Sequence, residues 1–534
     1  MSTRNSKEHD LSGADEGRDT PISQLEGESE DARIERLGRQ RPEKLKSLWI
    51  EIAFVFSITV GQALAEYFVS GFTILVPTVT KALDIPPSAT TWPASAFSLV
   101  VSAFLLPFGR VADIYGGYPV YMAGITWFAV LSLALGFAQN EITLDVLRAL
   151  QGLGPAAYLP AALQILGNTY RPGPRKSLVF FIYGGMGVMG FFVGFLFAGI
   201  AGEFLTWRWY FWIGSILVAI VAVASYIAIP SDVEEHKNNG VKMDWLGSCT
   251  TISGLILVIY AITDSSHATQ GWATPRILVT FILGIGMLAV AFYVEGWIAE
   301  QPLLPFEVFK IKGMRPFILG LLFCYGPLGI FLLYTTLLSL NVWGISPMQL
   351  VAWYTPVVIV GLILAIGGGM TLHLIPAKVL MAVTGLAIIL ESVLLALAPA
   401  EVNYWKWVFI PMLCSTVAFD VIFSVANIFF STSLPAHQQG LAGSLGNALV
   451  QLGIALLLGF AEVIASQTAY QGQQQSYRNV FWFNMACGAM ALVLFSFVSI
   501  GRANSDLTAD EKAAVKAATE DDVLQSSRAS TSEN

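Results

Sequence analysis

Residues 109–120 read GRVADIYGGYPV and lie between two apolar runs, each long enough to cross a lipid bilayer. A single acidic residue, Asp113, stands between Gly109 and Gly116 in a Gly-x-x-x-Asp-x-x-Gly pattern. A Gly-Tyr pair follows the second glycine, at positions where basic residues would make the turn more polar. Because glycine permits tight backbone turns and close approach, this stretch predicts a short connection between two membrane-spanning helices.

The composition of the whole chain also favours a membrane protein. Of its 534 residues, 55% are hydrophobic and 12% are charged, and the mean hydropathy is +0.64. A soluble domain carries about 25% charged residues, so this chain has about half the usual charge. Backbone polar groups must be satisfied within each spanning segment, which favours helices. We therefore expect an all-α polytopic membrane protein.

The apolar runs set the number of transmembrane helices. A helix needs about 20 apolar residues to cross the hydrocarbon core, and on this basis we expect about fourteen spans. The expected spans are residues 49–78, 91–111, 118–138, 142–166, 177–201, 208–229, 244–263, 276–298, 315–340, 348–370, 375–397, 404–431, 440–466 and 478–500.

The order of these spans predicts the domain organisation. We expect an N-terminal six-helix bundle at 49–230, a link with two extra transmembrane helices at 231–314, and a C-terminal six-helix bundle at 315–501. Residues 1–48 and 502–534 are polar and acidic, so we expect two disordered tails. Repeated halves with a substrate site between them are typical of transporters. Hydropathy alone does not exclude a channel as the alternative function, although no sequence typical of a selectivity filter is visible.

The distribution of basic residues predicts the orientation. Lys and Arg are more frequent in the loops on the side of the N-terminus than in the loops on the other side. Cytoplasmic loops of membrane proteins carry such an excess. We therefore expect both termini in the cytoplasm.

Ionisable residues within the spans are the candidates for transport chemistry, because a charge in the bilayer is costly unless it is paired or faces a cavity. Glu66 follows Gln62 by one helical turn on the same face. Asp145 and Arg148 share a face of a later span, with Gln151 beside them. The expected depths permit a contact between Glu66 and Arg148. Pairing of Arg148 with Asp145 in its own helix is the alternative.

The C-terminal half has one main polar stripe, formed by Asp420, Ser424 and Asn427 at helical spacing. This stripe is either part of a cavity or a hydrogen-bonded cluster between packed helices. Glu391 and Glu462 lie near the outer ends of their spans, and we expect them at the membrane interface.

Other residue types bear on substrate and on chemistry. Tyr158 and Tyr334 are among the aromatic residues that would suit a large apolar ligand, although contact with lipid is the alternative for most of them. The histidines fall in tails or loops, and the cysteines fall in apolar segments without CxxC spacing. We therefore expect no metal site, no cofactor, no enzymatic activity and no nucleic-acid partner.

These features together resemble the major facilitator superfamily, and within it the fourteen-helix drug:proton antiporters and fungal efflux proteins of the aminotriazole-resistance type. The resemblance covers about residues 49–500 and rests on four stretches in order. They are GRVADIYGGYPV at 109–120, VLRALQGLGPAA at 146–157, the fifth span followed by TWRWYFWI at 206–213, and the extra helix pair at about 244–298.

The chain also departs from the family pattern. The antiporter signature of helix five has a Gly-Pro pair, whereas Gly190 is followed by Phe191. The aspartate of the family's first-helix pattern would fall at Phe68. If the first helix holds a proton site, Glu66 must supply it.

The resemblance implies alternating access of two bundles and export of an amphipathic drug, toxin or fungal secondary metabolite in exchange for protons. It implies a monomer in the plasma membrane, with the vacuolar membrane as the alternative. An uptake carrier or facilitator of the same fold and a transport-inactive membrane sensor are the alternative functions. The residues expected to couple protons to transport are Glu66, Asp145, Arg148 and Asp420. Those expected in the substrate cavity are Gln62, Gln151, Tyr158, Tyr334 and Asn427. A conformational latch is expected at Gly109, Arg110, Asp113 and Gly116, with Asp113 bound to Arg110 or to a helix end.

Overall fold

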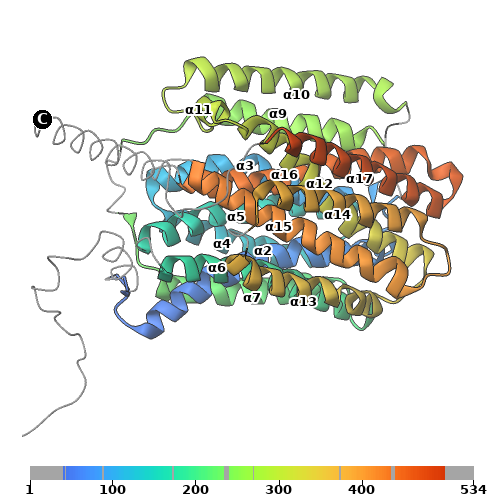
Figure 1. The fold of residues 1–534 in the computed structure, drawn as a ribbon, viewed down its shortest axis with the longest axis horizontal. Helices are drawn as coiled ribbons and strands as arrows, with labels where there is room; N and C mark the ends of the chain where they lie inside the picture. The colour runs from blue at the N-terminus through green and yellow to red at the C-terminus, as the bar shows by residue number, and fades with distance from the viewer. Residues whose placement is uncertain are drawn as a thin grey trace, which may run out of the picture.

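The computed structural model describes residues 40–498 apart from 43, 87–88, 171–173, 234–239, 267, 269, 372–374 and 434–438. Both expected tails lie mostly outside this range. The described part is built from helices that run side by side (Figure 1).

The first long helices are α2 (Leu48–Ala82), α3 (Trp92–Tyr115), α4 (Gly117–Leu135), α5 (Glu141–Thr169), α6 (Pro174–Glu203) and α7 (Arg208–Ala228). An extra pair follows, α9 (Trp245–Asp264) and α10 (Pro275–Tyr293), with the short α11 (Phe306–Lys310) after it. The last long helices are α12 (Met314–Leu337), α13 (Pro347–Thr371), α14 (Ala377–Leu397), α15 (Ile410–Ser433), α16 (Gln439–Gln467) and α17 (Gln473–Ser496).

The number of spans agrees with the sequence. Within the described residues, 13 helices are long and apolar enough to cross a membrane. The remaining long helix, α5, has 29 residues and is more polar because it carries Asp145 and Arg148. The expected ends are accurate to a few residues. The largest shift is at α15, which begins at Ile410 instead of residue 404 because a π-helical turn, Trp405–Phe409, precedes it.

Local sequence explains where several of these helices begin. The side chain of Ser47 accepts a hydrogen bond from the backbone of Ile50 at the start of α2. Asn140 does the same for α5, and Asp244 does so for α9. These side chains satisfy backbone N–H groups that have no partner within the helix.

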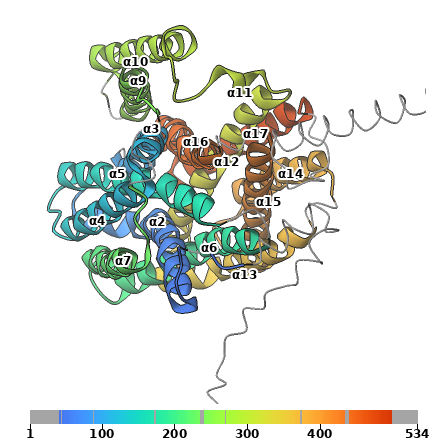
Figure 2. The same ribbon diagram turned by 90° about the vertical axis from the view of Figure 1, so that its left-hand side faces the viewer.

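The helices form two groups that Figure 2 shows end-on. In the first group, α2 packs on α6 and α7, and α5 packs on α3 and α4. In the second group, α12 packs on α16 and α17, and α14 packs on α15 and α17. The extra helices α9 and α10 lie outside both groups, where α9 contacts α3 and α16 (Figures 1 and 2).

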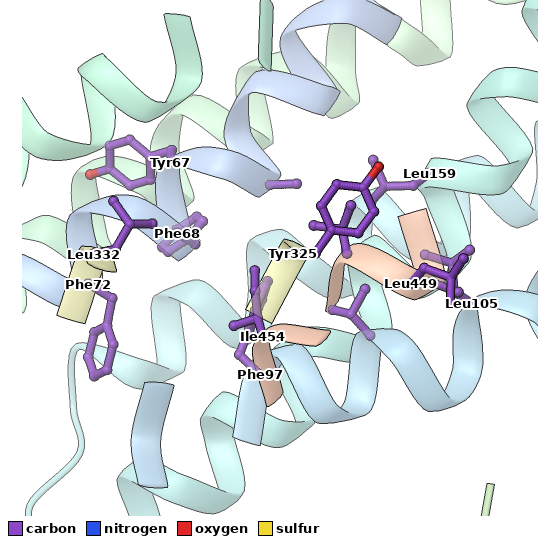
Figure 3. Close-up of a cluster of buried hydrophobic side chains, with 14 of the residues drawn as sticks. Tyr67, Phe68, Phe72, Phe97, Leu105, Leu159, Tyr325, Leu332, Leu449 and Ile454 are labelled. Carbon is purple, nitrogen blue, oxygen red and sulfur yellow. The ribbon is translucent and has the colours of Figure 1, made fainter. Parts of the chain in front are cut away.

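The two groups meet along two seams, which we call the α3–α16 seam and the α6–α13 seam. Small residues allow close approach there, with Gly109 near Ser444 and Gly199 near Val351. Buried side chains from both groups form one hydrophobic cluster that includes Phe97 of α3 and Ile454 of α16 (Figure 3). Side chains of both groups therefore fill the centre of the molecule.

Two carboxyl groups expected near the outer ends of their spans are buried between helices. We expected Glu391 and Glu462 at the membrane interface, but their exposed fractions are 1% and 3%. Glu391 on α14 is covered by α17, where the Asn484 side-chain amide donates to it at 3.5 Å. Their burial was not visible in the sequence, because the position of a residue along a helix does not show which face its neighbours cover.

Candidate functional site

Glu66 belongs to a polar cluster between α2 and α6. The Gln62 amide donates a hydrogen bond to Glu66 Oε1 at 3.2 Å, because the two side chains are one turn apart. The Tyr183 hydroxyl of α6 donates to Gln62 Oε1 at 2.8 Å. A Cβ atom at Gly187 would lie 3.9 Å from Glu66 Cγ, so this glycine leaves room beside the carboxyl group. The hydrogen bonds thus run from Tyr183 through Gln62 to Glu66. Among the described residues, no Lys, Arg or His forms an ion pair with Glu66.

Asp420 approaches the same turn of α6 from the other group of helices. Its Oδ2 atom is buried and has no hydrogen-bond partner among the described residues. A Cβ atom at Gly361 of α13 would lie 3.1 Å from Asp420 Oδ2 and 2.8 Å from Val188 of α6. Glu66 faces Gly187 and Asp420 lies near Val188, so two carboxyl groups flank adjacent residues of α6.

Arg148 is 1% exposed and is satisfied without an acidic partner. Its Nε donates to the carbonyl of Pro93 at 3.1 Å, and its Nη1 donates to the carbonyl of Phe68 at 3.4 Å and to Gln151 Oε1 at 2.8 Å. Gln151 in turn donates to Ser132 at 2.8 Å. These bonds tie α5 to α2, α3 and α4.

Aromatic rings complete the surroundings of Arg148. The guanidinium carbon lies 4.2 Å from the centre of the Phe72 ring and 4.6 Å from that of Phe97. Such contacts stabilise a cation that has lost most of its water. A cavity of about 20 Å³ adjoins Arg148 between α2, α3 and α5 on one side and α12 and α16 on the other. The cation therefore lies where the two groups of helices meet.

The permitted contact between Glu66 and Arg148 is not made. Phe68 and Phe72 share the α2 face that meets Arg148, and residues two apart on a helix point in different directions. Glu66 is therefore turned toward α6. The alternative pairing is also absent, because Asp145 makes no ion pair with Arg148 among the described residues, and its Oδ1 is buried without a hydrogen bond.

The other cavity candidates make packing contacts. The Tyr158 hydroxyl donates to the carbonyl of Gly61 at 3.0 Å. The ring of Tyr334 lies 5.8 Å from that of Tyr477. The Asn427 amide donates to the carbonyl of Phe423 in its own helix at 2.9 Å.

The turn between α3 and α4 is fixed by residues from the central link. Arg110 donates to the carbonyl of Lys242 at 3.1 Å and to Gln301 Oε1 at 2.9 Å. At the N-terminus of α4, Asp232 accepts hydrogen bonds from the backbone of Gly117 and Tyr118 at 2.7 and 3.0 Å. We expected Asp113 to bind Arg110 or a helix end, and sequence reasoning missed Asp232. Its position in a polar link was the only available signal.

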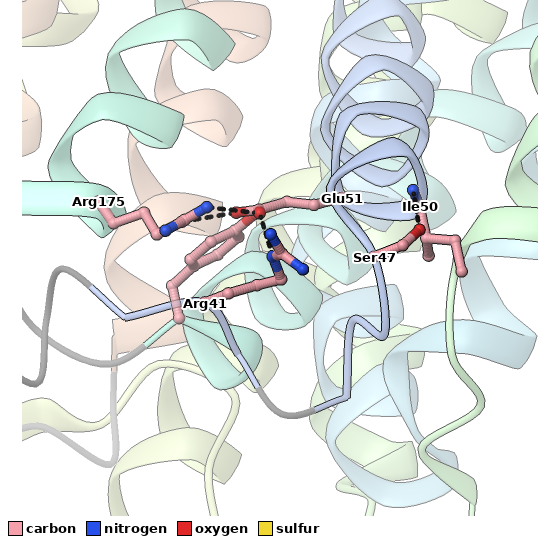
Figure 4. A network of polar contacts seen from close by, with 6 residues as sticks. Arg41, Ser47, Ile50, Glu51 and Arg175 are labelled. Carbon is pink, nitrogen blue, oxygen red and sulfur yellow. Dashed lines mark hydrogen bonds and ion pairs between the residues drawn. The ribbon is translucent and has the colours of Figure 1, made fainter. Parts of the chain in front are cut away.

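A second group that sequence reasoning missed lies at the start of α2 (Figure 4). Arg175 binds both oxygens of Glu51, with contacts of 2.7 and 2.6 Å. Tyr170 donates to Glu51 Oε1 at 3.1 Å, and Arg41 lies 3.5 Å from Oε2. Burial raises the pKa of Tyr170, and the hydrogen bond to Glu51 raises the pKa of Arg175. Both side chains therefore remain donors at neutral pH.

Across the residues that the structure describes, no group of three or more His, Cys, Asp or Glu side chains is close enough to hold a metal ion.

Comparisons with known proteins agree with this architecture. The chain is 33% identical to the low affinity ammonium transporter of Saccharomyces cerevisiae over 85% of this chain and 89% of the relative. It is 28% identical to efflux pump terJ of Aspergillus terreus, over 93% and 97% of the two chains. It is 29% identical to the aminotriazole resistance protein of S. cerevisiae over 85% of each chain.

Solved structures show the same fold at lower identity. The nucleoside transporter NupG matches 84% of this chain and 100% of its own with a TM-score of 0.58 and 15% identity. A peptide transporter, POT, covers 83% and 95% with a TM-score of 0.59 and 17% identity. The model of the Major Facilitator Superfamily matches residues 58–458. The chain is a multi-pass membrane transporter that belongs to the major facilitator superfamily and is similar to its fungal efflux-type members.

Proposed function

We propose that this transporter exports an amphipathic small molecule, such as a drug, a toxin or a fungal secondary metabolite, in exchange for protons. Relatives named as efflux pumps and as a multidrug transporter support export. In this proposal the transporter works as a monomer in the plasma membrane with both termini in the cytoplasm. Its helix groups expose the substrate site to each side in turn.

The observation that carries the proposal is the pair of carboxyl groups around the centre of α6. Glu66 from one group of helices and Asp420 from the other flank Gly187 and Val188. Neither carboxyl group has a described cationic partner, and burial of an unpaired charge is costly. Binding or release of a proton on either side of α6 therefore changes the free energy of packing α6 between the two groups.

Protonation would then select between two arrangements of the helices. A ligand shifts a conformational equilibrium only by its different affinity for the two states, and the proton is such a ligand here. Gln62 and Tyr183 orient the Glu66 carboxyl group through their hydrogen bonds. Arg148 lies where the groups meet and would respond through packing, since its bonds run to the α2 and α3 backbones.

The α3–α4 turn is the proposed latch. Gly109, Arg110, Asp113 and Gly116 keep this role in the proposal, with Asp232 and Gln301 as the groups that hold the turn. Exchange of Asp113 for Asn should slow transport and leave folding intact. Transport at the wild-type rate in that variant would reject the latch.

Transport in proteoliposomes tests proton coupling. An inward proton gradient should drive movement of a fluorescent amphipathic amine, and Glu66→Gln should remove the dependence on the gradient while substrate binding remains. The matched control is Glu401→Gln, since Glu401 is an exposed glutamate in a loop. If Glu66→Gln leaves the gradient dependence unchanged, Glu66 has no part in coupling.

Uptake is the second candidate, because one relative is named a low affinity ammonium transporter. The two functions predict different results in cells that overproduce the protein. Export lowers the steady-state level of an added amphipathic amine in the cell, and uptake of ammonium raises growth on limiting ammonium. Growth rescue without any change in amine level would favour uptake.

A further inference from the structure

Glu462 lies on the α3–α16 seam near the end of the bundle where α2 finishes, which we call the distal end. It is 3% exposed and belongs to the last turns of α16. Thr91, the residue before α3, is the neighbouring side chain across the seam. The carboxyl group therefore lies between the two groups of helices.

The polar atoms at this contact are not satisfied. The Thr91 side chain interacts with the Glu462 carboxyl group, but Glu462 Oε2 and Thr91 Oγ1 are both buried, and neither makes a hydrogen bond of normal distance and angle with a described residue. An unpaired carboxylate in such a place is costly, whereas the neutral acid can be buried at a much smaller cost. The closed packing of this seam is therefore compatible with the neutral acid and opposes its ionised form.

Among the described residues, no cation from the helices around Glu462 forms an ion pair with it. Tyr334 of α12 and Tyr477 of α17 are the titratable groups that interact with it. On α9, Gly459 of α16 packs against Thr263, and the nearby Asp264 is paired with Arg276 at 2.6 Å. At pH 5–8 the tyrosines are neutral, so Glu462 is the group at this junction that changes charge.

The other seam is closed at the same end by a carboxylate of a different kind. Glu203, at the end of α6, accepts a hydrogen bond from the backbone N–H of Met348 at 2.8 Å. Met348 is in the first turn of α13, where a negative charge is favourable. Glu203 is exposed whereas Glu462 is buried, so the carboxyl groups at the two seams differ in their access to water.

We propose that Glu462 is a proton-controlled gate residue on the α3–α16 seam, neutral while the distal end is closed and ionised when that end opens to water. On closing, the carboxylate takes up one proton from the distal solution, and on opening it returns one. If the distal side is the cell exterior, an external proton promotes closure. The role of this gate in a transport cycle rests on the proposed proton-coupled transport.

The distance across the distal end tests the gate directly. Spin labels would be attached through Ile142→Cys on α5 and Tyr470→Cys beyond α16, at residues that are 75% and 84% exposed. Serine would replace Cys249 and Cys414, the native cysteines that are not buried. Electron–electron distances would be measured in lipid nanodiscs between pH 5 and pH 8.5.

In the wild type the ratio of open to closed molecules should rise with pH. The slope approaches about tenfold per pH unit where the two states differ by one bound proton. Glu462→Gln and Glu462→Met, both neutral and of similar size, should remain closed and lose this slope. Glu203→Gln is the matched control and should keep the slope, because the Glu203 side chain is exposed and lies on the other seam.

Two results would overturn the gate: a wild-type ratio that does not change with pH, or a wild-type slope in both Glu462 variants. The measurement uses neither substrate nor a proton gradient. A pH-dependent gate in a protein that exports nothing would therefore refute the proposed function alone. Export that depends on Glu66 in a protein without the slope would refute the gate alone.

Discussion

Asp232 closes the N-terminus of α4 by accepting a hydrogen bond from the backbone of Gly117 at 2.7 Å. Asp232 follows α7, so the contact joins the end of the first six helices to the turn between α3 and α4. Gly116 makes this geometry possible, because its φ is +98° and a Cβ atom there would lie 2.7 Å from Asp232 Oδ1. The glycine-rich turn is thus shaped to receive a carboxylate from a distant segment.

The first prediction concerns this cap. Asp232→Ala should lower the free energy of unfolding by about 1–2 kcal/mol, the usual cost of losing an N-terminal cap. Thermal unfolding in detergent would measure the loss. Asp232→Asn keeps one acceptor and should lose less. An unchanged midpoint in Asp232→Ala would show that the cap does not contribute to stability.

The second prediction concerns Arg148. A lysine at this position has one nitrogen and cannot reach Pro93, Phe68 and Gln151 together. Loss of one charge-assisted hydrogen bond, at about 1.5–3 kcal/mol, should slow transport by about 10- to 150-fold. Initial rates in proteoliposomes would measure the effect.

The control for that experiment is Arg208→Lys. Arg208 is a partly exposed arginine that donates to the carbonyl of Ala138 at 3.1 Å near the end of the bundle. Lysine should replace it with little effect on the rate. Equal rates for Arg148→Lys and the wild type would mean that transport does not require the several hydrogen bonds of the Arg148 guanidinium group.

The third prediction concerns Glu51, which holds Arg175 and Tyr170 at the start of α2. Glu51→Gln removes the charge from a largely buried contact and should lower the free energy of unfolding by about 1–3 kcal/mol. Glu300→Gln is the comparison, because its ion pair with Lys242 is exposed and should not affect the unfolding temperature. Equal thermal-unfolding midpoints for the two variants would show that the buried contacts of Glu51 stabilise the protein no more than an exposed ion pair.

The fourth prediction separates two glycines of α6. A Cβ atom at Gly190 would lie 2.1 Å from the carbonyl oxygen of Ala63, whereas one at Gly187 meets only ordinary contacts. Gly190→Ala should therefore separate α2 from α6 and lower the yield of folded protein. Gly187→Ala should fold normally, as judged by gel filtration. Similar behaviour of the two variants would reject the close packing.

The sequence predicted the helices well because a membrane imposes their length. Each apolar run must be about as long as the bilayer is thick, and the backbone has no alternative to the helix there. Of the long helices, α5 is the most instructive, since its polar residues lower its hydropathy below that of the other spans. Its length and its cap at Asn140 still identify it.

The site was less predictable because its contacts are made with the backbone and across distant segments. The acceptors of Arg148 include two carbonyl groups, which every residue has and no motif marks. Asp232 and Glu51 find their partners across more than a hundred residues of chain. The exact bounds of the expected domains and the roles of the site residues remain predictions.

The extra helix pair covers one of the two seams and leaves the other without such a cover. Helix α9 lies over the α3–α16 seam and contacts both of its helices, whereas no such pair lies over the α6–α13 seam among the described helices (Figure 2). In a bilayer, α9 would keep lipid tails from the first junction, and lipid tails would reach the second one. An apolar substrate dissolved in the bilayer would have a preferred side of approach, opposite to α9 and α10.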